Sequence, residues 1–532
     1  MTLRESYFPA DRSVPLLDVS IGQLLIDAAA DSPDTIALVD GAAAADQRRR
    51  WTYPQLLHAA LGVAHELLAR FEPGERVAIW APSMPEWEIV QMGAALAGIT
   101  VVTVNPAYTA VELGYVLAQS RCAGIVMVPA YRGVDLFGVL DVARSAAPVP
   151  ALREVLDLTT WRPTPTDDGH GLPAVAPHSV AMIQYTSGTT GFPKGAMLSH
   201  DGMVNNAMLF GRRFQLAPGS TWVNPLPMFH VGGCAFSALG ALCRRATHVL
   251  LAFEPRLALQ LIEEERGTFL PAVPTMLMAM LEHPDFATFD LSSLEVVMSG
   301  GASIPPELVL RVESHMGAKF GAVFGQTETC GVICISHPSD STPDKTLRVG
   351  RPLEQSEVKI VAVGSDVAVP CGEVGEICVR GFGVMLGYFD AAEQTAQAIT
   401  PDGWLHTGDL GTMDDRGYLA VTGRLKEMII RGGENIFPRE IEDRLHEHPD
   451  VADVAVVGVP DARWGEEAVA FVRPAAGASP APLELEAFLR ERLAGHKVPR
   501  RWVMLDVLPL TLSGKVQKFR LREQYEAGAF EA

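Results

Sequence analysis

Short apolar runs alternate with helical patterns along the first quarter of the chain, and this alternation is the strongest constraint on the fold. Runs with the length of buried strands lie at residues 77–80, 101–104 and 125–128. Helical stripes lie at residues 52–68, 86–97 and 111–119. Thr52 and Gln55 have the spacing of a capping box at the start of the first stripe. Because alternating strands and helices form mainly parallel sheets covered by helices, the sequence predicts an α/β fold.

Composition limits the size and the partners of the protein. The chain has 532 residues, a formal net charge of −20 and 48% hydrophobic residues, which suffices for two or more domains with large cores. It has no long run of Lys or Arg. Nucleic acid and anionic membranes are recognised through clustered positive charge, so neither is predicted as the main partner.

The N-terminal segment and the longest uncharged stretch predict no membrane span. Residues 1–13 mix charges and prolines where a secretory signal needs a continuous apolar run, so we expect a cytoplasmic protein. Residues 89–111 include Gly93, Gly98 and Pro106, and fit a buried helix followed by a buried strand. Peripheral membrane contact and a homodimer stay open.

Cysteine and histidine spacing indicates no metal cluster. The seven cysteines include no Cys-x-x-Cys pair, so reduced thiols are expected. His446 and His448 lie two residues apart and would not share a helix face, which favours a solvated surface. Lys518 is likewise expected to be a solvated surface charge.

The chain divides into a large N-terminal region and a small C-terminal domain. We predict an N-terminal domain over residues 1–425, with two α/β halves and a smaller β-rich part, and an α+β domain over residues 426–532. Residues 161–178 are rich in Pro, Thr, Asp and Gly, and are expected to form an exposed connection. Residues 41–50 are expected to form a surface insertion.

A segment rich in glycine and hydroxyl residues predicts a phosphate-binding loop. Its candidate ATP ligands are Thr186, Ser187, Gly188, Thr189, Thr190, Gly191 and Lys194. Glycines let backbone N–H groups approach a polyphosphate, hydroxyls add hydrogen bonds and the lysine adds charge. The spacing differs from that of a Walker A motif, so a P-loop kinase or ATPase is not supported.

Further motifs follow this loop in a fixed order. They are PMFHVGG at 227–233, SGGA at 299–302, FGQTET at 324–329, GWLHTGD at 403–409, TGRLKE at 422–427, RGGENI at 431–436 and PLTLSGK at 509–515. With them the chain resembles, over nearly its whole length, the acyl-CoA synthetases of the adenylate-forming (AMP-binding) superfamily. It looks most like the medium- and long-chain fatty acyl-CoA synthetases.

The resemblance implies a first half-reaction in which a carboxylate attacks ATP, releases pyrophosphate and forms an acyl adenylate. It implies Lys515, His230 and Glu328 as catalytic residues, with Glu328 and Thr186 at a Mg²⁺ ion. Asp409 is implied to bind the ribose, with Arg424 beside it. The remaining implied ATP contacts are Gly301, Ala302, Gly325 and Thr327. A carboxylate suits the ribose because it accepts two hydroxyl hydrogen bonds well.

The resemblance implies a second half-reaction in which the thiol of CoA displaces AMP. In the family a mobile C-terminal domain carries the catalytic lysine and swings between the two steps. Lys426 matches the hinge, and Gly432 and Gly433 match the segment that closes on CoA. A narrow tunnel with no room for a Cβ would explain these glycines.

The acid substrate is expected to be apolar. The predicted acyl pocket comprises Phe229, Val231, Cys234, Phe324, Gly331 and Val332. These stretches contain no charged group that is clearly placed for an amino or second carboxyl group. A fatty acid is favoured, and an aryl or sterol-derived acid would fit the same composition.

Three other functions share part of this pattern. An acyl-AMP ligase would load a carrier protein, but such relatives usually carry an extra segment that is not apparent between Asp409 and Lys426. A luciferase-type oxygenase would need an unusual acid. A non-catalytic nucleotide-binding regulator would have no need of Lys515.

Overall fold

The computed structural model describes residues 2–42, 44–146, 148–186, 193–302, 304–510 and 516–530. Some predicted site residues lie outside these ranges, namely Ser187, Gly188, Thr189, Thr190, Gly191 and Lys515. Across the described ranges, no helix combines the length and the apolar character needed to cross a bilayer.

The alternating pattern near the N-terminus forms a mainly parallel sheet, as predicted. Its strands lie in the order β21-β11-β10-β5-β4-β6-β9. Their bounds are β4 (Arg76–Trp80), β5 (Thr100–Thr103), β6 (Gly124–Met127), β9 (Glu154–Asp157), β10 (Val180–Thr186), β11 (Lys194–Ser199) and β21 (Gly387–Tyr388). Pairing is parallel from β10 through β9, whereas β11 is antiparallel to both β10 and β21.

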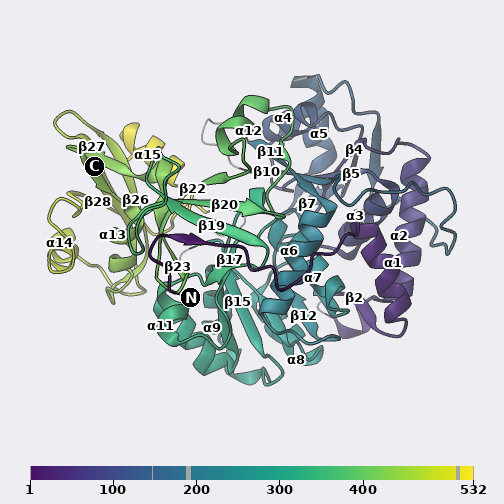
Figure 1. The fold of residues 1–532 in the computed structure, drawn as a ribbon, viewed down its shortest axis with the longest axis horizontal. Helices are drawn as coiled ribbons and strands as arrows, with labels where there is room; N and C mark the ends of the chain where they lie inside the picture. The colour runs from purple at the N-terminus through teal and green to yellow at the C-terminus, as the bar shows by residue number, and fades with distance from the viewer. Residues whose placement is uncertain are drawn as a thin grey trace.

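Helices cover this sheet (Figure 1). Three of them were predicted, namely α2 (Tyr53–Leu68), α3 (Pro85–Ala97) and α4 (Ala110–Gln119). The sequence patterns did not indicate the other two, α1 (Ile21–Asp31) and α5 (Leu136–Ala146). The capping box that starts α2 is present, with the Thr52 N–H donating to Gln55 Oε1 at 2.9 Å. Nearly all of α3 is buried, including the polar side chains of Glu88 and Gln91.

A second sheet continues the parallel architecture. Its order is β18-β17-β16-β15-β14-β12-β13-β2-β3, with parallel pairing from β16 to β2. The strands are β2 (Ile36–Asp40), β3 (Arg50–Thr52), β12 (Thr221–Asn224), β13 (Thr247–Leu250), β14 (Phe269–Pro271), β15 (Val296–Gly300), β16 (Lys319–Phe324), β17 (Cys334–Ile335) and β18 (Arg351–Pro352). The helices between them include α6 (His200–Arg213), α7 (Ala238–Cys243), α8 (Pro255–Glu264), α9 (Pro274–Leu281), α10 (Pro306–Arg311) and α11 (Thr342–Leu347).

Two smaller sheets follow. An antiparallel sheet contains β1 (Tyr7–Phe8), β19 (Ser356–Val361), β20 (Gly375–Gly381), β22 (Leu405–Met413) and β23 (Leu419–Arg424), and α12 (Ala392–Ala398) precedes β22. The C-terminal sheet contains β24 (Ile429–Arg431), β25 (Glu434–Ile436), β26 (Val451–Asp461), β27 (Gly465–Pro474) and β28 (Arg501–Met504). Its helices are α13 (Pro438–Leu445), α14 (Pro482–Arg490) and α15 (Lys518–Glu526).

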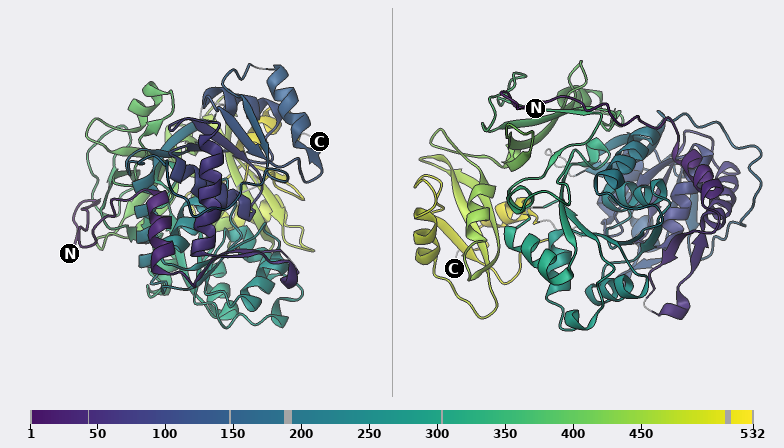
Figure 2. Two further views of the ribbon diagram at one scale, coloured as in Figure 1. Left: turned by 90° about the vertical axis from the view of Figure 1, so that its right-hand side faces the viewer. Right: turned by 60° about the horizontal axis from the view of Figure 1, so that its bottom comes forward.

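The C-terminal sheet lies to one side of the rest of the chain (Figures 1 and 2). It has its own hydrophobic clusters, one around Ile441, Leu445 and Leu485 and another around Phe471 and Leu521. A region with its own apolar core satisfies the main requirement for an independently packed domain.

Two polar side chains that were expected at the surface are buried. Residues 45–47, 49 and 50 are exposed, as expected for a surface insertion, but the Arg48 side chain is only 1% exposed and pairs with Glu264 and, at 2.8 Å, with Glu265. His448 is buried as well, at 7% exposure. Both side chains are polar in sequence, and only contacts with distant segments remove them from solvent.

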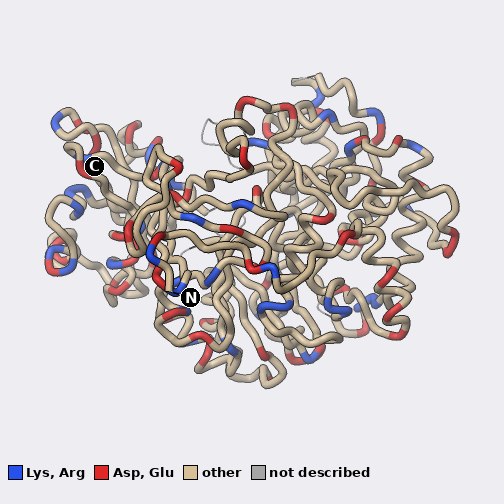
Figure 3. Tube along the Cα trace, viewed as in Figure 1, with Lys and Arg blue, Asp and Glu red and all other residues tan. Residues whose placement is uncertain are grey.

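Charges of both signs are distributed over the whole trace (Figure 3). Blue segments (Lys and Arg) and red segments (Asp and Glu) lie among one another in this view. The excess of 63 acidic over 43 basic residues is therefore not gathered in one region of the molecule.

Candidate active site

Two predicted ATP and metal ligands meet where strands of the two large sheets end. Thr186 is the last residue of β10, and Glu328 lies in a 3₁₀ turn, Thr327–Thr329, that follows β16. The Thr186 hydroxyl donates to Glu328 Oε1 at 3.2 Å. Glu328 is 8% exposed. In α/β folds ligands bind beyond the carboxyl ends of parallel strands, which is where this pair lies.

Tyr388 joins this pair although it belongs to none of the motifs used for the prediction. Its hydroxyl donates to Glu328 Oε1 at 2.9 Å. Burial raises the pKa of Tyr388, and the neighbouring Glu328 carboxylate raises it further. Lys194 Nζ lies 5.0 Å from the centroid of the Tyr388 ring. Lys194 also pairs with Thr186 across β10 and β11, so the two flanks of the predicted phosphate loop are adjacent.

The Thr186 and Glu328 side chains fit a magnesium ion chemically. Mg²⁺ prefers oxygen ligands and is usually held by one or two carboxylates together with substrate phosphates. A buried carboxylate with a hydroxyl 3.2 Å away, next to a segment suited to phosphates, offers that donor set. The described residues also contain two mixed clusters with ligand spacing, namely Glu376 with Cys378 and His406, and His448 with Asp450 and Glu484.

Asp409 and Arg424 form a cross-strand pair. They are register partners on β22 and β23, and Arg424 Nε lies 3.2 Å from Asp409 Oδ1. Asp409 is 7% exposed, whereas the Arg424 side chain is 44% exposed. The arginine compensates the buried carboxylate and remains accessible to a ligand.

The predicted glycines of the nucleotide site occupy positions where a side chain would not fit. A Cβ on Gly325 would lie 2.1 Å from the carbonyl oxygen of Gly331, so these two predicted residues are in close contact. Gly301 has a φ of +78°, which strongly favours glycine, and Ala302 beside it is exposed. Thr327 is buried next to Glu328.

His230 lies beside the predicted acyl pocket. Its Nδ1 accepts a hydrogen bond from the Gly232 N–H at 3.2 Å, and its carbonyl accepts one from the Cys234 thiol at 3.3 Å. Residues 232–237 form a π-helix, a rare conformation that is frequent at functional sites. Val231 is buried and Phe229 is half-buried.

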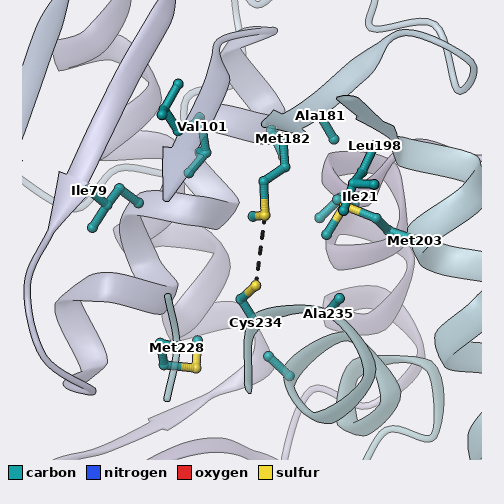
Figure 4. Packing of buried hydrophobic residues seen from close by; sticks show 14 of the residues in the cluster. Ile21, Ile79, Val101, Ala181, Met182, Leu198, Met203, Met228, Cys234 and Ala235 are labelled. Carbon is teal, nitrogen blue, oxygen red and sulfur yellow. Dashed lines mark hydrogen bonds between the residues drawn. The ribbon is translucent and has the colours of Figure 1, made fainter. Parts of the chain in front are cut away.

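The predicted acyl-pocket residue Cys234 has more polar neighbours than the sequence suggested. The Cys234 Sγ faces Met182 Sδ at 3.7 Å (Figure 4), and both sulfurs accept from the Gln184 amide, at 3.0 and 3.1 Å. Gln184 is 2% exposed. Gln91, also buried, donates to the carbonyl of Cys234 at 3.0 Å. Two amide side chains that the sequence did not point to therefore surround Cys234.

The other end of the predicted pocket is held by Asn206. Its amide donates to the carbonyls of Val332 at 2.8 Å and Thr329 at 3.2 Å. Val332 is buried and Phe324 is half-buried. The contacts fix the turn that follows Glu328 against α6.

Lys426 lies in a 3₁₀ turn, Leu425–Glu427, between β23 and β24. Burial lowers its pKa, and the neighbouring Arg424 lowers it further. The carboxylates of Asp409 and Glu328 partly oppose this shift, so both lie within electrostatic reach of the Lys426 ammonium. The hinge candidate therefore experiences the charges of both predicted ligands, Asp409 of the ribose and Glu328 of the metal.

Lys518 is not a solvated charge. It pairs with Glu427 at 2.9 Å and with Glu442 at 2.8 Å. Glu427 follows Lys426, and Lys518 begins α15 directly after the segment that contains Lys515. This ion pair connects the predicted hinge turn to the helix that follows the segment of the predicted catalytic lysine.

Gly432 and Gly433 form the two-residue turn of the β24–β25 hairpin. Their φ values are +61° and +90°, as type I′ hairpin turns require. A Cβ on Gly432 would lie 2.8 Å from the Trp464 ring, but a Cβ on Gly433 would meet no atom within 4 Å. For Gly433 the backbone conformation, and not a lack of space in this arrangement, explains the glycine.

Comparisons with known proteins place this site in a family. The family described as AMP-binding enzyme matches residues 25–389, and the AMP-binding enzyme C-terminal domain matches residues 440–515. The chain belongs to the AMP-binding enzymes. The predicted α/β fold class and the predicted enzyme class, an adenylate-forming acid–thiol ligase, are confirmed.

Individual relatives match over almost the whole chain. YngI of Bacillus subtilis (strain 168), whose name describes an acyl-CoA synthetase, is 39% identical over 96% of this chain and 97% of its own. The human mitochondrial medium-chain acyl-CoA ligase ACSF2 is 35% identical over 95% of this chain and 88% of its own. ATP-bound MatB from Rhodopseudomonas palustris has a TM-score of 0.84 at 29% identity, covering 96% of this chain and 99% of its own.

Proposed function

We propose that this ligase activates medium-chain fatty acids to their CoA thioesters, with ATP converted to AMP and pyrophosphate. The observation that carries the proposal is the buried Glu328 carboxylate, bound by Thr186 at the end of β10 and adjacent to the glycine-rich segment. The names of YngI and ACSF2 support an acyl-CoA product.

In the first half-reaction, the site must bring a carboxylate to the α-phosphorus of ATP although both are anions. Bound Mg²⁺ supplies neutralising charge, and Glu328 and Thr186 would hold it. Asp409 binds the ribose hydroxyls, with Arg424 beside it. Lys515 bridges the acid and the nucleotide.

In the second half-reaction, the domain of residues 426–532 turns about Lys426 and withdraws Lys515. The hairpin turn at Gly432 and Gly433 then borders the path of the CoA thiol, with His230 at its inner end. A step of this type can limit turnover.

A Lys426→Pro variant tests the hinge. Proline fixes φ near −65°, within the range of the 3₁₀ turn that Lys426 occupies here, so the variant keeps this arrangement and resists others. We expect transfer of the acyl group from supplied acyl-AMP to CoA to slow at least about tenfold, and pyrophosphate release to change less than about threefold. Single-turnover measurements of both steps check this.

Lys426→Ala is the matched control, since it removes the ammonium but leaves φ free. It is expected to transfer the acyl group faster than the proline variant. Equal rates in the two variants would assign the effect to the lost charge and contradict the hinge.

A medium chain is favoured because of the amides around Cys234. An alkyl chain that extends past Cys234 would pack against the buried Gln184 amide, which donates to two sulfur atoms, and a polar amide is an unfavourable neighbour for methylene groups. A chain that ends before Cys234 avoids this cost. The kcat/KM for octanoate is therefore expected to exceed that for palmitate.

The test is ATP-dependent pyrophosphate release with octanoate, palmitate, benzoate and a sterol-side-chain acid, with and without CoA, and with thioester detection. We expect kcat/KM for octanoate to be about tenfold or more above that of the other acids. A preference for benzoate or the sterol-derived acid would contradict a fatty-acid substrate and assign the enzyme to aryl or sterol-derived acids. Adenylate formation without CoA consumption would favour an acyl-AMP ligase that loads a carrier protein.

The cellular setting follows the same proposal. We place the enzyme in the cytoplasm with ATP, CoA and a small carboxylic acid as its partners. Homodimer formation and peripheral membrane contact stay predictions.

A further inference from the structure

A buried carboxylate outside all the predicted site residues lies next to Asp409. Glu376 is on β20, and its side chain is 8% exposed. An ionised carboxylate at such a position needs hydrogen-bonding or charged partners to offset its lost hydration. Its partners therefore indicate what it does.

Both carboxylate oxygens of Glu376 bind one short segment. The Gly408 N–H donates to Oε1 at 3.0 Å, and His406 Nδ1 lies 2.9 Å from Oε2. The other ring nitrogen of His406 lies 3.4 Å from Asp366 Oδ1. The histidine is thus oriented from both sides, and Glu376 binds the backbone directly before Asp409.

The same strand holds this segment at a second point. The Thr407 hydroxyl donates to the carbonyl of Ile377 at 2.7 Å and accepts from the N–H of Asp409 at 3.1 Å. Gly408 between them has a φ of +69°. The regular ladder between β20 and β22 shifts register here, so side-chain contacts replace part of the backbone pairing that would otherwise position Asp409.

The cluster is better explained by hydrogen bonds than by a metal ion. Cys378 Sγ lies 3.5 Å from His406 Nδ1, so Cys378, His406 and Glu376 have ligand types suited to zinc. Two N/O ligands of one tetrahedral zinc lie about 3.3 Å apart. The observed 2.9 Å between Nδ1 and Oε2 is that of a hydrogen bond, and Oε1 is already bound to Gly408. Burial also raises the pKa of the Cys378 thiol to about 12, which disfavours the thiolate ligand.

We propose that Glu376 is a positioning residue for ribose recognition: it holds the Gly408 backbone, and thereby fixes the Asp409 carboxylate towards the ribose hydroxyls. The inference rests on the proposed role of Asp409 as the ribose ligand. Glu376 acts through the backbone and touches no substrate.

The test compares ATP with 2′-deoxy-ATP and 3′-deoxy-ATP as substrates of the full-length enzyme with octanoate, by pyrophosphate release. For Glu376→Ala we expect KM for ATP to rise roughly tenfold. This is the change expected when the ribose loses one hydrogen bond to the charged Asp409 carboxylate. We expect kcat to change less than about threefold, and the preference for ATP over the deoxynucleotides to fall several-fold. If Glu376 only stabilised the fold, its replacement would lower the rates with all three nucleotides by the same factor.

Two variants of the same position sharpen the result. Glu376→Gln keeps an oxygen for the Gly408 N–H and is expected to restore KM and nucleotide preference to within about threefold of wild type. Glu376→Asp keeps the charge but withdraws the oxygen by one methylene, and should behave like alanine. It serves as the test if the alanine variant does not fold. Glu373→Ala, an exposed carboxylate before the same strand, is the matched control and should behave as wild type.

Two outcomes separate this inference from the proposed function. Wild-type nucleotide preference in both Glu376→Ala and Glu376→Asp, together with a reduced preference in Asp409→Asn, would overturn the role of Glu376 alone. Wild-type preference in Asp409→Asn would overturn the ribose role of Asp409 and the positioning role with it.

Discussion

Replacement of Lys515 by alanine is expected to lower the rate of adenylate formation about a thousandfold, as loss of a group that stabilises transition-state charge does. Acyl transfer from supplied acyl-AMP to CoA should stay within about threefold of wild type, because in the proposed mechanism Lys515 withdraws before that step. Pyrophosphate release measures the first half-reaction. Thioester formation from synthetic acyl-AMP measures the second.

Lys515 lies outside the described residues, but both flanks of its segment are fixed. Leu510 and Val516 pair as an antiparallel bridge, and the Gln517 N–H donates to the carbonyl of Pro509 at 2.8 Å. Lys518, which follows Gln517 in the sequence, binds Glu427 next to the proposed hinge residue Lys426. A rotation at Lys426 would therefore carry the flanks of the lysine segment with it.

Lys497→Ala is the matched control for the loss of one lysine from the same domain. Lys497 pairs with Glu440 of α13 at 2.7 Å, and its removal should leave both half-reactions near wild type. A Lys515→Ala enzyme that lost both half-reactions equally would show that the lysine does not alternate between the two steps.

Local sequence signals predicted the helices of the first sheet well. Thr52 and Gln55 make their reciprocal bonds within four residues of chain, so no distant segment is needed to start α2. The largely apolar stretch that forms α3 and β5 is almost completely buried, and its residue pattern was sufficient to predict a buried helix followed by a buried strand. The α/β class followed from these elements alone.

Contacts between distant segments were not predictable in this way. Tyr388 reaches Glu328 only because β21 pairs with β11. Gln184 is a polar residue in a strand, and only the packing of the π-helix against β10 places its amide on Cys234. Arg48 is buried for the same reason, since its partners Glu264 and Glu265 lie at the C-terminal end of α8. Each of these depends on tertiary packing, which periodicity does not encode.

The family resemblance pointed to candidate site residues, but the physical reason expected for a residue type was not always correct. Gly433 was expected to lack space for a Cβ, yet its surroundings are open and its φ of +90° explains it. Crowding and positive φ both select glycine, and the amino-acid letter alone does not distinguish them.

A Glu328→Gln variant is expected to lower adenylate formation by about a hundredfold or more, because it removes the charge that would hold Mg²⁺ and keeps the shape of the side chain. The amide oxygen can still accept from Thr186 and Tyr388, so the fold around the turn should persist. Pyrophosphate release is measured over a range of Mg²⁺ concentrations. The Mg²⁺ concentration for half-maximal rate should rise together with the loss of rate.

Tyr388→Phe separates the charge of Glu328 from its orientation. This variant removes one hydrogen bond to Oε1 and leaves the carboxylate group in place, so we expect the rate of adenylate formation to fall roughly tenfold or less. Its Mg²⁺ requirement should change less than that of Glu328→Gln, because the metal would keep its charged ligand. An unchanged Mg²⁺ requirement in Glu328→Gln would show that the carboxylate supports the turn after β16 and does not bind the metal. A larger loss in Tyr388→Phe than in Glu328→Gln would instead make the tyrosine the primary residue of the pair.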